Sequence, residues 1–557
     1  MATFFQDLVQ YRRLLQMIFV LGVGGSFQVG FQISMITYTS VHVKAFINDT
    51  WLERSGLPVP PETLTLLWSS VVSIYGLGGL LSSMTSGYLA GKYGKKKCLL
   101  GNNVVMLLSA CLLGFSKAAR SFEMLLVGRF LSGVSAGLCV PLHPQYLGEV
   151  SPKKLRGFAN STISLFRSLG KALGQIMGQR ELLGTALLWP VLMAFTGISS
   201  SIQLLTLPFF PESPPHLFLH KGDEEACLKA METFWGKGHH QAELDDLRKE
   251  RATLKSARSK SVWEVVKDPS LRWQLYMLVL TVVTMQLSGI HAVDCSVVPK
   301  SQLLRSIVSK CLHLCGEAMP CSGALCGAVP DSDVVESAPG FSVNQSSPPQ
   351  IYFYTFEVLQ AAGFDKDHIP YLTLGVSLCE LVSAVFCSFI IEQFKRKTIL
   401  WGGYWLMATV LAVVTLTLSL QHWASWMPYC SLVLLFCFVI CFAVGPAGAI
   451  GSVRVEIFDQ SSRSSAFVIG GAFNWIGVFA IGMVFPFIVE SFQQFSFLIF
   501  MGALYLSGLL IYFFLPETKN KSIVEIREEF DKLNFKGKSA LALDGSVTEV
   551  GRFCTKL

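Results

Sequence analysis

The sequence predicts an all-α membrane protein with twelve transmembrane helices in two pseudo-symmetric halves of six. Three observations carry this prediction. The chain of 557 residues is 51% hydrophobic and only 15% charged, whereas a soluble chain holds roughly 25% charged residues. Its apolar residues come in blocks of about 20, the length that an α-helix needs to cross a bilayer. One polar motif occurs in both halves, which is typical of a duplicated unit.

The repeated motif is a Glu followed seven residues later by an Arg, at a polar hinge between two apolar runs. Glu149 and Arg156 form the first copy, and Glu456 and Arg463 form the second. Each half also closes on a Pro-Glu pair: Pro211-Glu212 and Pro516-Glu517. Internal repeats of this kind in a membrane protein are characteristic of transporters, whose substrate site lies at the midplane between the repeats.

The hydropathy pattern places six spans in each half. The first half contains 14–34, 65–87, 98–117, 122–145, 157–178 and 186–207. The second contains 271–293 (resumed at 351–362), 370–391, 399–417, 425–448, 465–489 and 495–515. The domains are therefore residues 1–207, a linker at 208–270, residues 271–515 and a tail at 516–557. Leucines that recur among charged residues predict short amphipathic helices in the linker: Leu244, Leu247 and Leu254.

The loops predict the orientation of the chain in the bilayer. Lys and Arg gather in the loops after spans two, four and eight, and the alternate loops hold fewer. The positive-inside rule then places both termini and the linker in the cytoplasm. The net charge of +7 is explained by this placement, so no nucleic-acid partner is expected. The sequon at Asn48 falls in the first outside loop, where it predicts a glycosylation site.

Residues 294–350 break the pattern of the second half. They contain five cysteines, many Ser and Pro residues, and no apolar run long enough to span a membrane. Because unsatisfied backbone is too costly in the hydrocarbon core, this segment is either an outside loop after a shortened seventh span or an artefact of splicing or gene modelling. The second interpretation is favoured, since Gly289–Ala292 joined to Ile351–Tyr354 would restore one continuous helix.

Several motifs together resemble a known family. They are Gly128-Arg129, the two Glu/Arg hinges, the two Pro-Glu pairs, Gln286–Ile290, Glu392 with Arg396-Lys397, and Asn474-Trp475. In this order and spacing the chain resembles the sugar-porter branch of the major facilitator superfamily, and within it the facilitative hexose transporters of solute carrier family 2, in their fructose-transporting class. The resemblance implies the major facilitator fold, a hexose substrate, a bilayer environment in the plasma membrane, and no cofactor.

The resemblance also implies two gates. A cytoplasmic gate of ion pairs would hold the halves together when the site opens outward, and a set of charged residues matches it: Arg129, Glu149, Arg156, Glu392, Arg396, Glu456 and Arg463. Read without the family, these are helix-end charges that reach the interface. Tyr352 and Tyr354 resemble an extracellular aromatic gate.

A sugar site needs convergent hydrogen-bonding groups and an aromatic face. By resemblance these groups are Gln286, His291, Glu380, Asn474 and Trp475. Span five adds a polar stripe at steps of three and four residues: Ser164, Arg167, Ser168, Lys171 and Gln175. The family carries no cations on this stripe. Arg167 and Lys171 therefore either reach the interface, pair with Glu380, or attract an anion, and the sequence leaves these three choices open.

The predicted function is uniport of hexoses, fructose rather than glucose, by alternating access. Small residues at Gly445–Gly451 replace a Trp that often stands there in the family, which favours the fructose-transporting class. Proton-driven relatives carry an Asp where this chain has Gln32, which does not titrate. The alternatives are an organic-anion carrier of urate-like substrates, and a non-transporting sensor or non-functional splice product. Metal-binding pairs, phosphate loops and nucleophile motifs are missing from the sequence, so no enzyme activity is expected.

Overall fold

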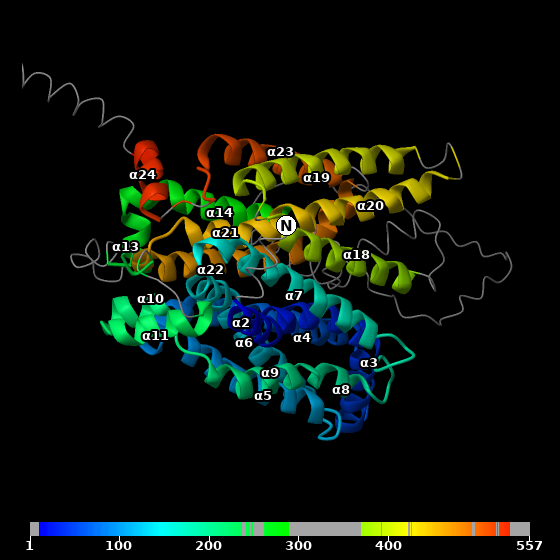
Figure 1. The fold of residues 1–557 in the computed structure, drawn as a ribbon. Coiled ribbons are helices and arrows are strands. Elements are labelled where there is room, and N and C mark those ends of the chain that lie inside the picture. The colour runs from blue at the N-terminus through cyan, green and yellow to red at the C-terminus, as the bar shows by residue number, and fades with distance from the viewer. Residues whose placement is uncertain are drawn as a thin grey trace, which may run out of the picture.

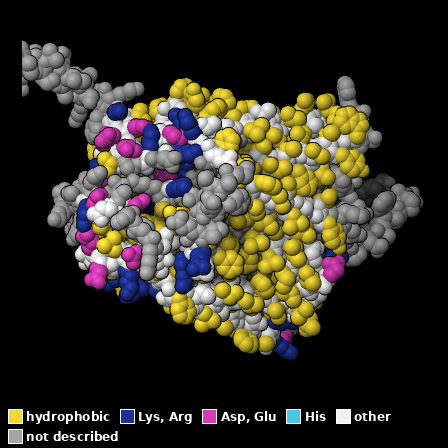
Figure 2. Space-filling view, in the orientation of Figure 1, with side chains coloured by type: hydrophobic (Ala, Val, Ile, Leu, Met, Phe, Trp, Pro, Cys, Tyr) yellow, Lys and Arg dark blue, Asp and Glu magenta, His cyan; other side chains and the backbone are white. Residues whose placement is uncertain are grey.

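The computed structural model describes residues 11–236, 241, 243–245, 247–248, 261–288, 369–391, 393–420, 424, 426–492, 496–519, 521 and 523–534. This part of the chain is helical and contains no strand. By length and composition, nine helices within it are suited to cross a membrane. Apolar side chains cover the flank of the bundle, and charged side chains gather at one end (Figure 2). A bundle of apolar helices satisfies its own backbone hydrogen bonds, as a bilayer requires.

The first half contains the predicted spans one to six. Its helices are α2 (Arg12–Leu21), α3 (Phe27–Ser55), α4 (Pro61–Tyr93), α5 (Lys95–Phe115), α6 (Phe122–Val150), α7 (Arg156–Met177), α8 (Trp189–Ala194) and α9 (Thr196–Thr206). A π-helical turn at Gly22–Ser26 joins α2 to α3. The first helix is longer than predicted, because α3 continues to Ser55 and ends at Gly56 with φ of 70°.

The second half repeats this arrangement. Its helices are α14 (Arg272–Leu287), α18 (Ile369–Ile390), α19 (Arg396–Ser419), α20 (Met427–Val444), α21 (Pro446–Glu456), α22 (Gln460–Phe492) and α23 (Ser496–Phe514). Span ten is divided between α20 and α21, since Pro446 lacks the N–H that a continuous helix needs. The insert at 294–350 and the continuation at 351–362 lie outside the described residues.

Each half has its own hydrophobic core. One core runs through α2 to α9 and includes Trp68 and Trp189, and the other runs from α13 to α24 and includes Tyr404 and Phe438. Figure 1 shows the two halves side by side. They meet where α7 contacts α18 and α21 and where α4 contacts α22. This pairing of two separately packed halves supports the predicted twelve-helix, two-half fold.

Short helices occupy one end of the bundle (Figure 1). They are α10 (Pro214–His216), α11 (Glu224–Trp235), α13 (Val262–Lys267) and α24 (Ile523–Asn534). α11 docks onto the first half, because the indole Nε1 of Trp235 donates to the backbone oxygen of Val150 at 2.8 Å. Of the linker leucines, Leu244 is buried and Leu247 is partly buried, whereas Leu254 lies outside the described residues.

Candidate functional site

A cavity of about 260 Å³ lies between the two halves. It is lined by α3, α4, α6 and α7 of the first half and by α14, α18, α20, α21 and α22 of the second. Six predicted substrate residues face it: Ser164, Arg167, Lys171, Glu380, Asn474 and Trp475. A cavity at the junction of two repeats is the position expected for the substrate of a carrier.

An ion pair crosses this cavity from one half to the other. The ammonium Nζ of Lys171 on α7 lies 3.2 Å from Oε2 of Glu380 on α18. The hydroxyl of Ser168 donates to Oε1 of Glu380 at 2.8 Å. Both charged side chains are about 95% buried, where an isolated charge would be very costly. Pairing with Glu380, one of the three choices left open by the sequence, is therefore what Lys171 does.

The second half contributes an amide pair. The side-chain Nε2 of Gln286 on α14 donates to Oδ1 of Asn474 on α22 at 2.9 Å. This contact leaves the Asn474 nitrogen for other partners and fixes the orientation of its amide. Trp475 packs edge-on against Tyr75 of the first half, with ring centroids 5.6 Å apart. Gln286 thus acts on the cavity through Asn474, since it is not itself among the lining residues.

Other predicted substrate and gate residues either are described but do not line the cavity or lie outside the described part of the chain. Gln175, near the end of α7, is buried but is not among the lining residues. His291, Tyr352, Tyr354 and Glu392 lie outside the described residues. The predicted extracellular gate is consequently not described by the structure.

Arg129 does not belong to the cytoplasmic gate, so that part of the sequence prediction is wrong. It lies twenty residues before Glu149 on α6, which separates the two by about 30 Å along the helix axis. Its guanidinium donates to Oε1 of Gln32 at 2.7 Å and lies over the ring of Tyr75. The predicted loop orientation already puts the start of α6 at the outer side, and this signal should have excluded Arg129 from an inner gate.

Sequence reasoning missed Arg454, which also lines the cavity. It lies on α21, two residues before Glu456. The predicted span ended at residue 448, so Arg454 fell in what was taken for a loop. The extra turns of α21 carry this cation along the wall of the cavity instead.

The ends of the two halves that carry the Glu/Arg hinges are joined through Glu149. Its Oε1 lies 3.0 Å from Nζ of Lys95 and 3.4 Å from Nη1 of Arg463, and Oε2 accepts from the hydroxyl of Ser213 at 2.7 Å. Lys95 belongs to the first half, Ser213 to the linker and Arg463 to the second half, so the Glu149–Arg463 ion pair bridges the halves. Lys95 was not among the predicted gate residues, although the sequence predicts a basic loop there; in the structure it begins α5.

The second copy of the hinge has a looser ion pair. The Nε of Arg396 lies 4.0 Å from Oε1 of Glu456. Both residues belong to the second half, as Arg396 begins α19 and Glu456 ends α21. Arg156 begins α7, immediately after the hinge of the first half. Among the predicted gate residues, Glu149 and Arg463 form an ion pair between the halves, with Nη1 of Arg463 3.4 Å from Oε1 of Glu149.

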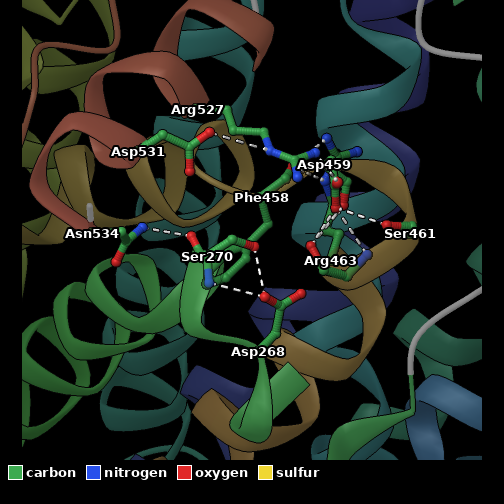
Figure 3. A network of polar contacts seen from close by, with 10 residues as sticks. Asp268, Ser270, Phe458, Asp459, Ser461, Arg463, Arg527, Asp531 and Asn534 are labelled. Atoms are coloured by element: carbon green, nitrogen blue, oxygen red, sulfur yellow. Dashed lines mark hydrogen bonds and ion pairs between the residues drawn. The ribbon is translucent and has the colours of Figure 1, made fainter. Parts of the chain in front are cut away.

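The tail helix α24 connects to the same region. Figure 3 shows Asp459 between Arg527 of α24 and the start of α22. Arg527 Nη1 lies 3.4 Å from Asp459 Oδ2, and Oδ1 of Asp459 accepts from the backbone N–H of Ser462 at 3.0 Å. The amide of Asn534 donates to the backbone oxygen of Ser270 at 2.6 Å. The tail is therefore fastened to the segment that carries Arg463.

The sequon at Asn48 is not in a loop, which corrects the sequence prediction. Asn48 lies in the last two turns of α3 and is half-buried. The hydroxyl of Thr50 is buried and donates to the backbone oxygen of Phe46 at 2.7 Å. Helix α3 therefore extends beyond the predicted first span and includes the sequon.

Comparison with known proteins defines the class. The family model for the sugar (and other) transporter matches residues 17–295 and 346–530. Two solved structures share the fold, each at 17% identity. The proton:xylose symporter XylE bound to 6-bromo-6-deoxy-D-glucose has a TM-score of 0.71, with 93% of this chain and 99% of that chain covered. The inward-open XylE of E. coli has a TM-score of 0.59, with 92% and 99% covered.

This chain belongs to the sugar transporter family of the major facilitator superfamily. Its relatives are members of solute carrier family 2, as the motifs predict. Facilitated glucose transporter member 11 of Homo sapiens is 36% identical, with 95% of each chain covered. Member 9 of Mus musculus is 35% identical, with 94% of this chain and 87% of that chain covered. Member 5 of Rattus norvegicus is 34% identical, with 93% and 91% covered. The assignment to solute carrier family 2 that the motifs predict is thus confirmed, and members of this family are not enzymes.

Proposed function

We propose that this chain is a facilitative hexose uniporter of the plasma membrane, with fructose rather than glucose as its substrate. The observation that carries the proposal is the cavity between the halves, spanned by the Lys171–Glu380 pair and lying on the same interface as the Glu149–Arg463 bridge. In the proposed orientation that bridge, the linker and both termini are cytoplasmic. The names of the relatives, facilitated glucose transporters, support a hexose substrate.

The cavity offers the groups that a hexose needs. Ser164, Asn474 and the carboxylate of Glu380 supply hydrogen-bonding atoms, and Trp475 supplies an aromatic face. Gln286 orients Asn474. Ala447, Ile450 and Gly451 form part of the wall, which is less bulky than a Trp and supports fructose. Other predicted residues complete the proposed site and gates: His291, Tyr352, Tyr354, Arg156 and Glu392.

Alternating access follows from the position of the ion pairs. Glu149 and Arg463 belong to different halves, so their contact must break when the cytoplasmic end opens. A conformation that contains the bridge is closed there, and substrate reaches the cavity from the opposite side. The bridge lowers the free energy of one of the two states, as a carrier needs.

Uniport is supported by the surroundings of Gln32. Its Oε1 accepts from Arg129 and its Nε2 donates to the hydroxyl of Thr196 at 3.1 Å. Where proton-driven relatives carry an Asp, this chain has an amide that does not exchange a proton. Hexose uptake should therefore neither alkalinise the medium nor accumulate sugar above the outside concentration.

The test of the function is uptake of labelled fructose, glucose and urate by the chain with and without residues 294–350. The matched family segments omit residues 296–345, so the shortened chain is expected to transport. Lys171→Ile should reduce fructose uptake at least tenfold, because it leaves Glu380 buried without its cation, at a cost of roughly 3 to 5 kcal/mol. The double change Lys171→Ile with Glu380→Gln removes both charges and serves as the control, with uptake partly restored.

The same experiment separates hexose carriage from the organic-anion alternative. Lys171 has a carboxylate partner, so we expect fructose uptake to exceed urate uptake. Arg167→Thr is measured beside Lys171→Ile to examine the second cation of the stripe. Urate uptake that disappears in both variants, with fructose never carried, would overturn the hexose assignment. Failure of both forms of the chain to carry or bind any sugar would favour a non-functional splice product.

A further inference from the structure

Arg454 is a cation in the cavity wall without a counter-charge among the described residues. Its Nε and Nη2 atoms are buried and have no hydrogen-bond partner there. It lies within electrostatic range of Arg167, which has the same sign, and of the phenol of Tyr404. A buried guanidinium is normally paired, because its desolvation is costly. The region around Arg454 therefore favours a negative charge.

Asn160 lies on the facing helix of the other half and also lines the cavity. Its side chain is 1% exposed, and neither the amide nitrogen nor the amide oxygen has a partner in the described part of the chain. α7 and α21 pack closely here, since a Cβ on Gly451 would lie 3.4 Å from the backbone oxygen of Asn160. A buried amide without hydrogen-bond partners costs about 1 to 3 kcal/mol, so Asn160 is also suited to bind a ligand.

The position is separate from the Lys171–Glu380 pair. Asn160 precedes Lys171 by eleven residues on α7, which corresponds to about 16 Å along the helix axis toward the end that carries Glu149. Arg454 is likewise two residues from the inner end of α21. The two side chains therefore define the inner end of the cavity, between the polar groups of the hexose site and the bridge that closes it.

The charges lining the cavity do not balance. Four cations line it, Arg129, Arg167, Lys171 and Arg454, and Glu380 is the one carboxylate among the described lining residues. Glu380 lies against Lys171, so it does not compensate Arg454. A water molecule could satisfy the amide of Asn160, but it would leave the charge of Arg454 in place.

We infer that Arg454 and Asn160 form a binding subsite for one monovalent anionic group, with the chemistry of a carboxylate. The guanidinium supplies a charged donor pair and the amide supplies a further N–H. This rests on the proposed function in that the same cavity holds the hexose. The group is either the carboxylate of a sugar acid, whose hydroxyls occupy the hexose site, or a separate small anion bound beneath a neutral sugar.

The experiment measures the thermal unfolding of the purified full chain in lipid nanodiscs at constant ionic strength. The probes are glucuronate, its neutral methyl ester, fructose and chloride, with chloride replaced by a bulky sulfonate in the reference buffer. Ligands that bind the folded state raise Tm. We expect a raised Tm with glucuronate at a concentration at least tenfold lower than with the methyl ester. Arg454→Met should abolish that difference, and Arg454→Lys should retain part of it.

Further comparisons test the anion subsite even if one variant folds poorly. Asn160→Leu should weaken glucuronate binding several-fold, and the ester comparison needs no mutation. Arg248→Met removes the same charge from an exposed ion pair of the linker and should not change the Tm response to glucuronate.

An Arg454-dependent chloride effect without a glucuronate effect assigns the subsite to a free anion. Equal effects of glucuronate and its ester, with no chloride effect, overturn the subsite, whereas a missing fructose effect counts against the hexose function alone.

Discussion

In both halves the loop before the third helix is capped by a carboxylate, but the contacts that form the cap differ. In the first half, Oε1 of Glu212 accepts from the backbone N–H groups of Lys96 and Ser213, both at 3.2 Å. In the second half, Glu517 accepts from the backbone N–H groups at the start of α19 and from its own segment: Arg396, Lys397, Thr518 and Lys519. In each case a carboxylate that follows the sixth span caps the third helix of its half.

The two loops differ in the residue that precedes the third helix of each half. Gly94 has φ of 85°, and a Cβ there would come within 2.6 Å of Oε2 of Glu212. Its counterpart Lys395 has φ of −72°, a conformation open to any residue. The structure shows that the second loop caps its helix without the left-handed residue.

The ion pair between the start of the third helix and the hinge glutamate is closer in the first half than in the second. Lys95 lies 3.0 Å from Glu149, whereas Arg396 lies 4.0 Å from Glu456. Glu149 also holds Arg463 across the interface. The bridge between the halves thus joins the Glu of the first copy of the motif to the Arg of the second copy.

The largest expected effect comes from breaking that bridge. Arg463→Ala should shift the resting conformation toward cytoplasmic opening, because Glu149 loses the partner that it has in the closed state. A buried pair that loses one member costs roughly 3 kcal/mol or more, which is a shift of about a hundredfold. The measurement is labelling of a cysteine at Ile33, which lines the cavity, by an impermeant thiol reagent added outside.

Comparison of the two copies sharpens this prediction. Glu456→Ala should change outside labelling less than Arg463→Ala, because its 4.0 Å contact with Arg396 lies within the second half and need not break when the halves separate. Arg527→Ala, which removes a partly exposed arginine from the same end of the molecule, should leave labelling unchanged. Unaltered labelling in both gate variants would show that these residues do not form a gate.

The sequence predicted the elements well because each depends on local hydropathy. Spans of about 20 apolar residues become helices wherever the chain places them in a bilayer. Pairings between distant segments were less accessible. The sequence offered Glu380 as one choice for Lys171, but the choice depends on how α7 packs against α18. Arg129 was assigned to the wrong end because motif order was weighed above the loop orientation, and Arg454 was missed because α21 runs past the last apolar residue.

A smaller effect is expected from the two caps. Glu517→Ala removes an acceptor for four backbone N–H groups, so it should lower the free energy of unfolding by about 2 kcal/mol, at the upper end for helix caps. Glu212→Ala removes an acceptor for two and should cost about 1 kcal/mol. The measurement is thermal unfolding of both variants and of the unchanged chain in one detergent. A larger loss for Glu212→Ala would contradict the ranking by backbone contacts.

The smallest effect concerns the pH dependence of the first cap. Burial raises the pKa of the Glu212 carboxyl above its usual value, although the N–H groups of Lys96 and Ser213 and the charge of Lys95 act against this. A raised pKa in the folded state means that the neutral form is favoured there. Its contribution to stability is present below the unfolded pKa of about 4.3 and is lost as the pH rises through the folded pKa.

Glu212→Gln keeps an acceptor oxygen but does not ionise, so it isolates that contribution. The Tm of the variant minus that of the unchanged chain should increase as the pH rises from about 4 through the raised folded pKa, and then remain constant. The increase should amount to a few degrees at most, since the backbone N–H groups already compensate part of the burial. A difference that stays flat over this window, or one that falls as the pH rises, would show that the carboxyl of Glu212 is not disfavoured by burial at the start of α5.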